Sequence, residues 1–298
     1  LLERALSIKE REYGPEHVEV AATLGKLGNA FGDLGDYPKQ KELLERALSI
    51  EERAYGTDHV EVAPTLGDLG NAFGNLGDYQ KQKELLERAL SIQERAYGPE
   101  HVEVAATLSN LGSAFGDLGD YQKAKELLER AYNITKNEFG SGHTRFAHVC
   151  IGLAKAHGGL KDGVRQQEYA QVAYDIYKSS MGPTHLLVAS ALLELGNAQV
   201  QVGNASEAVS MLNLSHTIFE RELGMESAAA AKAMRSLGVA KGSLGEVDSA
   251  VALLEGACKI FKRKFGPSHV QVETTTSALL QLTTALPEDR PKKKARFE

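Results

Sequence analysis

The sequence predicts an all-α fold in which antiparallel helix pairs stack in a row. Three observations support this prediction: a glycine that recurs every 42 residues, two helical patterns within each period, and glycine-containing turns between those patterns. A constant period along a whole chain indicates one supersecondary unit that is repeated and that packs on its neighbours. The recurring glycines are Gly14, Gly56, Gly98, Gly140, Gly182, Gly224 and Gly266.

The first helical pattern of the unit is clearest at 101–119. Its large apolar residues follow one another at spacings of four, three, four and three, which places them on one face of an α-helix. They are Val104, Leu108, Leu111, Phe115 and Leu118. The second pattern, as in 79–98, has an apolar side that we expect to be buried. It comprises Tyr79, Leu85, Leu86, Ala89, Leu90 and Ile92.

In three copies the two patterns are joined by a Gly-Asp dipeptide, at Gly35-Asp36, Gly77-Asp78 and Gly119-Asp120. Glycine is suited to the left-handed position after a helix, and aspartate caps the start of the next helix. The predicted turn is therefore short and tight. Pro64 lies several residues into one expected helix, so that helix either starts late or bends.

Counting these patterns divides 1–286 into a solenoid that begins and ends with half a unit. We expect a half repeat at 1–13 and a terminal helix at 268–286, whose many threonines provide a polar end. The six full pairs are predicted at 16–55, 58–97, 100–139, 142–181, 184–223 and 226–265. The segment 287–298 is basic and is predicted to be disordered.

The apolar and glycine positions resemble the signature of the tetratricopeptide repeat, with leucine in place of its usual first tryptophan. In one copy they are Leu108, Leu111, Gly112, Phe115, Gly119, Tyr121, Ala124, Leu128 and Ala131. The longer 42-residue period and the motif AYGPEHVEVAATL resemble the repeats of kinesin light chains and nephrocystin-type proteins. The resemblance implies a right-handed superhelical solenoid whose concave groove, lined by the first helices, binds peptides. The fourth repeat departs most, at Cys150, Ala154, His157 and Lys161.

Composition excludes some partners. The net charge of −6 argues against general binding to nucleic acid. No apolar run approaches the ~18 residues that a membrane helix needs. Cys150 and Cys258 lie in different repeats, so we expect two free thiols, a reducing compartment and a cytoplasmic protein. The chain opens within a helical pattern and without methionine, so we expect further repeats upstream that cover Leu1, Leu2 and Leu6.

A stripe of small and polar residues on the first helices is the strongest candidate binding surface. Gly25, Asn29 and Gly32 lie at i, i+4 and i+7, and the next copy has equivalent residues. A glycine inside a helix costs about 1 kcal/mol relative to alanine. Either the stripe is a shallow floor for a partner backbone, or the small residues let neighbouring first helices crowd together.

Charge along the predicted groove changes from acidic in the early copies to basic in the later ones. Such a gradient would fix the polarity of a charged peptide, although an ordinary solvated surface would have the same composition. The predicted partner-binding residues are Asn29, Asp33, Asn71, Asn75, Ser113, Asp117, Lys155, Asn197, Lys232 and Arg235.

Two further recurrent residue types are assigned structural roles. One histidine per unit, as at His17, is spaced too widely for the four ligands of a zinc site, so we expect it to pack against or cap the start of a first helix and expect no metal. The glycines at the tetratricopeptide crossing position are expected to let the second helix pack closely. They are Gly28, Gly70, Gly112, Gly196 and Gly238.

The chain contains no phosphate-binding loop, dinucleotide turn, zinc-protease motif or nucleophile elbow. We therefore expect no catalytic activity and no cofactor. The tail carries a short basic run that is similar to a nuclear-import signal, although such runs are common in exposed tails. It comprises Lys292, Lys293, Lys294 and Arg296.

The sequence thus predicts an adaptor or scaffold that binds a protein or peptide along its groove. Two alternatives stay open: a structural spacer within a large multiprotein assembly, and the sensor arm of a larger signalling protein.

Overall fold

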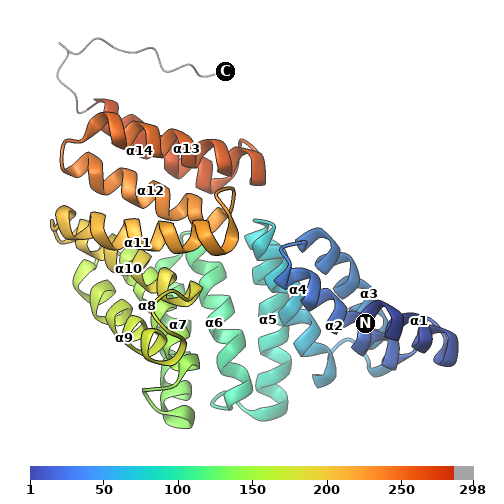
Figure 1. The fold of residues 1–298 in the computed structure, drawn as a ribbon. Coiled ribbons are helices and arrows are strands. Elements are labelled where there is room, and N and C mark those ends of the chain that lie inside the picture. The colour runs from blue at the N-terminus through green and yellow to red at the C-terminus, as the bar shows by residue number, and fades with distance from the viewer. Residues whose placement is uncertain (285–298) are drawn as a thin grey trace. The chain divides into compact units, whose positions relative to one another are not determined.

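A computed structural model describes residues 1–284, and over that range all of the secondary-structure elements are helices (Figure 1). The helices follow one another as packed pairs joined by short turns. This confirms the predicted all-α fold of successive helix pairs. The chain divides into two compact units, Leu1–Ser180 and Met181–Glu298, which we describe separately.

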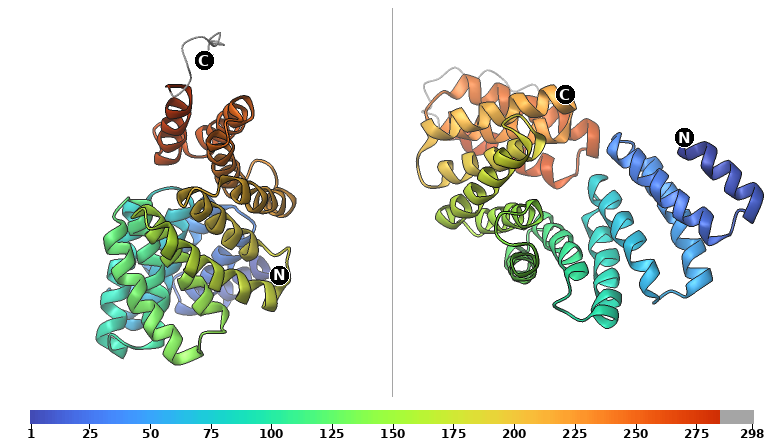
Figure 2. Two further views of the ribbon diagram at one scale, coloured as in Figure 1. Left: turned by 90° about the vertical axis from the view of Figure 1, so that its left-hand side faces the viewer. Right: turned by 60° about the horizontal axis from the view of Figure 1, so that its bottom comes forward.

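The first unit holds a single helix followed by helix pairs, each a first helix and a longer second helix. The right-hand view in Figure 2 shows these blue to green helices side by side in chain order. They are α1 (Leu2–Tyr13), α2 (Val18–Asp33), α3 (Tyr37–Tyr55), α4 (Ala63–Asn75), α5 (Tyr79–Tyr97), α6 (Val102–Asp117), α7 (Tyr121–Phe139), α8 (Thr144–Gly159) and α9 (Gly163–Met181).

The second unit repeats the same pairing and ends on a first-type helix. Its helices are α10 (Leu186–Gln201), α11 (Ala205–Leu223), α12 (Ala228–Ser243), α13 (Val247–Phe265) and α14 (Val270–Thr284). In α14 only Val272 and Thr275 are buried. The predicted tail, with its basic run, lies outside the described residues.

The Gly-Asp turns have the predicted geometry. Gly35 has φ of 80°, and the backbone N–H of Asp36 donates to the carbonyl of Phe31 at 2.9 Å. The Asp36 carboxylate accepts from the N–H of Lys39 at 3.1 Å and so caps α3. The pair is therefore closed by one left-handed glycine and one side-chain cap.

The recurrent histidines cap the first helices, as expected. The Nδ1 atom of His17 accepts from the N–H of Glu19 at 3.2 Å, and its ring stacks on Tyr13 at 5.0 Å. The same hydrogen bond recurs at His59, His101, His143, His185 and His269. Within residues 1–284, no group of three or more residues is arranged to hold a metal ion.

Pro64 delays its helix rather than bending it. Val60–Val62 form a short 3-10 turn (η1), and α4 begins at Ala63 with the proline in its first turn. Proline is tolerated there because the first N–H groups of a helix have no intrahelical acceptor.

Close crossing of first and second helices explains one class of glycine. A Cβ atom added at Gly112 would lie 2.7 Å from Cγ of Leu128, and one at Gly152 would lie 2.6 Å from Cδ2 of the same leucine. The leucine side chain thus lies between α6 and α8 and is 1% exposed. Equivalent contacts at Gly28, Gly70, Gly196 and Gly238 confirm the predicted packing role.

Ion pairs link consecutive second helices. The Arg46 guanidinium contacts the carboxylate of Glu10 at 2.7 Å, and Arg130 contacts Glu94 at the same distance. Arg88 contacts Glu52 at 2.6 Å. Each of these arginines also donates to a backbone carbonyl in the junction that precedes the first helix of its own pair. The acceptors are Pro15 for Arg46, Thr57 for Arg88 and Pro99 for Arg130.

The fourth repeat keeps the pairing with different side chains. His157 replaces the usual aromatic residue, is buried, and stacks on Tyr169 at 5.5 Å. Its Nδ1 lies 3.2 Å from the carboxylate of Asp162. Lys161 occupies the left-handed turn position with φ of 64°, where the other described turns of this type have glycine.

Cys150 and Cys258 are both free and buried. Burial raises the pKa of the Cys150 thiol to about 12. Over residues 1–284, no helix has the length and apolar character required to cross a membrane.

Candidate interaction surface

The first helices present one side to solvent, which we call the first-helix face. In the first unit it consists of the outward sides of α2, α4, α6 and α8, each of which contacts the next. In the second unit it consists of α10, α12 and α14. Seven of the ten predicted partner-binding residues lie on the first unit and three on the second.

Asn29 and Asp68 connect two neighbouring first helices. The Asn29 Nδ2 atom donates to Oδ2 of Asp68 at 2.7 Å. Burial raises the pKa of the Asp68 carboxyl group, an effect that the hydrogen bond from Asn29 partly offsets. Asn29 is therefore exposed but already engaged within the chain.

The other predicted residues of the first unit differ in accessibility. Asp33 and Asn75 are exposed at the ends of their helices, and Asn71 is partly buried. Ser113 donates from its hydroxyl to the carbonyl of Ser109 at 3.1 Å. Asp117 is partly buried at the end of α6, and Lys155 is exposed on α8.

The predicted residues of the second unit are less accessible. Asn197 and Lys232 are both partly buried. Arg235 donates to Oε1 of Gln271 at 2.6 Å and lies over the ring of Phe261 at 5.6 Å. That arginine is held by α13 and α14, a contact that the spacing did not predict.

The glycine stripe separates into two kinds of position. A Cβ atom added at Gly25 or Gly67 would meet nothing within 4 Å. One added at Gly32 would lie 2.6 Å from the side-chain amide of Gln40, and Gly74 has the same relation to Gln82. Crowding between first helices therefore explains neither kind: the first lies in open space, and the second accommodates a glutamine from the second helix.

This distinction predicts opposite effects of the same substitution. Gly67→Ala should raise the free energy of unfolding by about 1 kcal/mol, because alanine is the better helix former and its methyl group contacts nothing. Gly112→Ala should lower it by about 1–3 kcal/mol, because the methyl group overlaps Leu128. Urea denaturation of the two variants measures both changes. Equal signs would contradict the assignment of Gly67 to open space.

A hollow of about 310 Å³ lies between α6 and α8 on this face. Its polar lining includes Asn110, Thr135, Arg145 and His148, with Glu103 also present. His148 is an exposed residue, but desolvation by the surrounding helices lowers its pKa, and Lys155 lowers it further. The Arg145 guanidinium lies over the Phe139 ring at 5.1 Å.

Thr135 marks a floor position that recurs every 42 residues between successive first helices. One repeat earlier the residue is Gln93, which is 8% exposed, and two repeats earlier it is Glu51, which is partly buried. Burial raises the pKa of Glu51; the Thr65 hydroxyl lowers it, and the charges of Glu61 and Asp68 raise it again. The Oε2 atom of Glu51 and the Oε1 atom of Gln93 are buried with no hydrogen-bond donor in the described residues.

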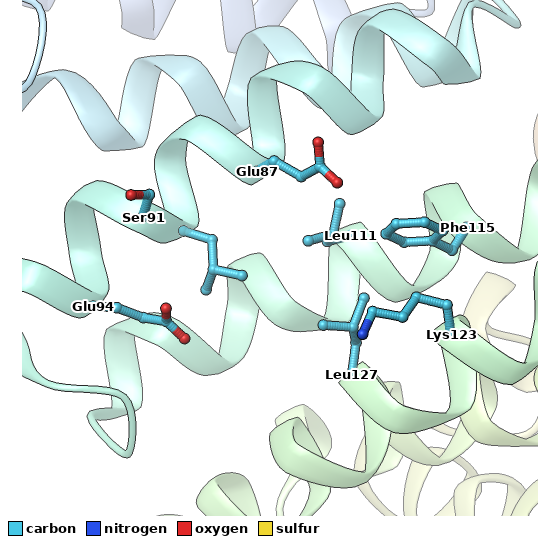
Figure 3. Close-up of a pocket in the computed structure, with 8 residues that line it drawn as sticks. Glu87, Ser91, Glu94, Leu111, Phe115, Lys123 and Leu127 are labelled. Carbon is cyan, nitrogen blue, oxygen red and sulfur yellow. The ribbon is translucent and has the colours of Figure 1, made fainter.

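The opposite side, which we call the second-helix face, is regular. It contains a groove of about 230 Å³. Figure 3 shows Glu87, Ser91 and Glu94 from α5 along one wall of this groove. Leu111 and Phe115 of α6 and Lys123 and Leu127 of α7 complete it, together with Leu90.

All eight residue types that line this groove recur unchanged at the equivalent positions of the two earlier repeats. One set is Glu45, Leu48, Ser49, Glu52, Leu69, Phe73, Lys81 and Leu85, and the other is Glu3, Leu6, Ser7, Glu10, Leu27, Phe31, Lys39 and Leu43. The second-helix face therefore repeats the same chemistry at each step.

Differences between the second and third 42-residue copies fall mainly on the first-helix face. Residues 43–84 and 85–126 differ at 9 of 42 positions. Six of these positions lie on the first helices' outward side or at the floor between them. The six pairs are Glu51/Gln93, Pro64/Ala106, Gly67/Ser109, Asp68/Asn110, Asn71/Ser113 and Asn75/Asp117.

Sequence reasoning missed Glu51, Asp68, Gln93, Arg145 and His148 as residues of this face. The signal that could have found the first three is the comparison above, since they vary where most positions are identical. The remaining two lie in the divergent fourth repeat, where no near-identical copy provides a reference.

Comparisons with known proteins agree with this architecture. The model of the tetratricopeptide repeat matches residues 1–50, 75–137 and 187–263. A search of curated proteins finds no match to this sequence.

Solved structures with the same fold include a candidate kinesin light chain of Podosopora anserina with nearly identical TPR-like repeats. It is 23% identical, with a TM-score of 0.54 over 69% of this chain and 97% of that one. BtubC (BKLC) from P. vanneervenii is 18% identical, with a TM-score of 0.55 over 88% and 98%. A Rap protein complexed with Competence and Sporulation Factor is 13% identical, with a TM-score of 0.61 over 89% and 75%.

The family match covers well over half of the 298 residues, and the helix pairs, crossing glycines and capped turns agree with it. The chain therefore belongs to the tetratricopeptide repeat family and is similar in fold to kinesin light chain-type proteins.

Proposed function

We propose that this chain is a non-catalytic scaffold that binds an extended peptide or a partner helix along its first-helix face. One observation carries the proposal: residues 43–84 and 85–126 are otherwise nearly identical and differ mainly on that face. A surface with different side chains at equivalent positions can select one partner sequence in one register. A surface that repeats itself cannot distinguish one register from the next.

The backbone of the first unit supports such a role. Gly25 and Gly67 leave open space on α2 and α4, so a partner backbone can approach closely there. The helices beneath are held by buried leucines at the crossing glycines and by arginine–glutamate pairs. A preorganised surface loses little conformational entropy when a partner binds.

Family membership supports the same proposal at a coarser level. Tetratricopeptide repeats are generally protein-binding scaffolds without catalytic activity. The similar Rap protein was solved with Competence and Sporulation Factor bound. The two buried, free cysteines favour a reducing compartment, and we place the protein in the cytoplasm.

The test is to select peptides from a random-sequence library on the immobilised protein and to measure their affinities for variants. Gly67→Leu should weaken binding at least tenfold, about 1.4 kcal/mol, because the new side chain fills the open floor of α4. Its helix should be no less stable, because leucine is a better helix former than glycine.

The matched control is Ser91→Leu, which places the same side chain in the groove of the second-helix face. This variant should bind the selected peptides as tightly as the unmodified protein. Unchanged affinity of Gly67→Leu for every selected peptide would contradict the proposed function.

A spacer subunit of a larger assembly is the second candidate, and the second-helix face favours it. Eight identical residue types in three consecutive grooves suit a contact that repeats along a regular partner. If Ser91→Leu weakens partner binding and Gly67→Leu does not, the spacer role replaces the peptide-binding role.

A further inference from the structure

The first-helix face has one region that is rich in hydrogen-bond acceptors and lacks a positive charge. It lies between α4 and α6, at the positions equivalent to the lining of the α6–α8 hollow one repeat later. Its polar side chains are Glu61 of η1, Asp68 of α4, Gln93 of α5 and Glu103 of α6, and we call these four residues the acceptor cluster. Among the residues that precede the lining of the α6–α8 hollow by 42 positions, none is lysine or arginine.

The three carboxylates of the acceptor cluster have no cationic partner. None of them forms an ion pair with another residue of 1–284, whereas many carboxylates of the second-helix face do. The neighbouring Glu51 adds a fourth negative charge, and it interacts unfavourably with Glu61 and Asp68. Like charges gathered without a counter-charge destabilise a fold unless a ligand neutralises them.

Gln93 provides an independent indication of a missing donor. Its side chain is 8% exposed, and its Oε1 atom is buried without a donor in the described residues. Thr135, the equivalent residue one repeat later, lines the α6–α8 hollow. By the same register Gln93 lies at the floor between α4 and α6. A buried carbonyl oxygen that lacks a donor is unfavourable, and a donor from a ligand would remove that cost.

Space for a ligand is present beside these acceptors. A Cβ atom at Gly67, next to Asp68, would meet nothing within 4 Å. The corresponding residue in α6 is Ser109, which is 3% exposed. The open space left by Gly67 therefore lies beside the acceptor cluster.

We propose that the acceptor cluster binds the cationic side chain of an arginine or lysine in the protein segment that occupies the first-helix face. Guanidinium or ammonium N–H groups donate to Oδ1 of Asp68, since Oδ2 already accepts from Asn29, and to Oε1 of Gln93. Glu61 and Glu103 add negative potential at the rim. Charge-assisted hydrogen bonds to a partly buried carboxylate are among the strongest available to a protein surface. This inference rests on the proposed function and adds the chemistry of the partner.

The α6–α8 hollow is an internal contrast to this site. At its equivalent positions Arg145 and His148 replace Glu103 and Ala106, and Asn110 replaces Asp68. Lys155 on α8 adds positive charge near His148. A basic side chain is thus accepted between α4 and α6 and disfavoured one repeat later, which sets the register of a charged partner segment.

The experiment is a double-mutant cycle on the arginine-containing library peptide that binds most tightly. The peptide is compared with a synthetic counterpart in which citrulline, which has a similar shape and no charge, replaces the arginine. For the unmodified protein the replacement should weaken binding about tenfold, and for Asp68→Asn it should have less than a twofold effect. Glu87→Gln, which removes one negative charge from the second-helix face, should keep the tenfold effect.

The outcomes distinguish failure of the proposed peptide-binding function from failure of the acceptor cluster assignment. If no selected peptide is sensitive to Gly67→Leu, the proposed function fails. If sensitive peptides exist but lack arginine and lysine, or if citrulline has the same effect with Asp68→Asn as with the unmodified protein, only the acceptor cluster assignment is overturned. If Asp68→Asn and Glu87→Gln reduce the effect of citrulline equally, the effect depends on overall charge. That result would also overturn the acceptor cluster assignment.

Discussion

Leu128→Ala is expected to lower the free energy of unfolding of the first unit by about 3 kcal/mol, within the 2–5 kcal/mol typical of buried leucines. The side chain is 1% exposed and fills the space between Gly112 and Gly152. The two glycines have no side chain that could fill the resulting cavity. The loss should therefore include a cavity contribution in addition to the lost transfer energy.

Urea denaturation of the whole chain measures this loss, with hydrogen exchange of α6, α7 and α8 as the local measurement. The second measurement is needed because repeat arrays can unfold in parts. Leu118→Ala is the matched control, since Leu118 is in the same pair and 43% exposed. It should change stability by no more than about 0.5 kcal/mol. Equal losses in the two variants would show that Leu128 does not join the neighbouring repeats.

The free energy of unfolding of the first unit should also fall steeply above about pH 9. The slope is set by the number of protons that the folded form retains after the unfolded form has lost them. Burial raises the pKa of Cys150 from 9.0 to about 12 and also raises the pKa of Tyr177. The pKa values of Tyr132 and Tyr169 are raised too, mainly by burial. All four groups lie on α7, α8 and α9, around the fourth repeat.

The sign follows from the order of deprotonation. The folded pKa of each group is above its unfolded value, so the unfolded chain loses the proton first as pH rises. The free energy of unfolding is therefore highest below about pH 9. It decreases as the pH rises from the unfolded pKa values through the folded pKa values of these groups. For Cys150 a rise from 9.0 to about 12 corresponds to on the order of 4 kcal/mol.

Unfolding by urea at pH 8 and at pH 11 measures the decrease. Cys150→Ala should reduce the difference between the two pH values, even though the variant is less stable at both. In the folded protein the Cys150 thiol should also resist alkylation by iodoacetamide at pH 8, because the thiolate is the reactive form. An unchanged pH difference in Cys150→Ala would indicate that the tyrosines alone cause the alkaline loss.

Much of the fold could be predicted because its signals are local and repeated. Gly35-Asp36 specifies a left-handed residue and a helix cap within a few positions, and His17 caps the next first helix through a neighbouring N–H. The apolar spacing defines which side of each helix is buried. Even so, Lys161 takes the left-handed conformation that glycine adopts in the other described turns of this type.

Side-chain environments were decided only by tertiary structure, since they depend on residues that are distant in sequence. The sequence shows Gly25 and Gly32 as one stripe, but Gln40 of the next helix fills the space beside only one of them. Likewise Arg235 was predicted to face a partner, and Gln271, 36 residues later, engages it. By itself the sequence determined the helix pairs, their period and their capped turns, because hydrogen bonds within a few residues control these features. Which glycines are open, and which acceptors lack donors, depends on how neighbouring helices pack, and only the assembled repeats decide that.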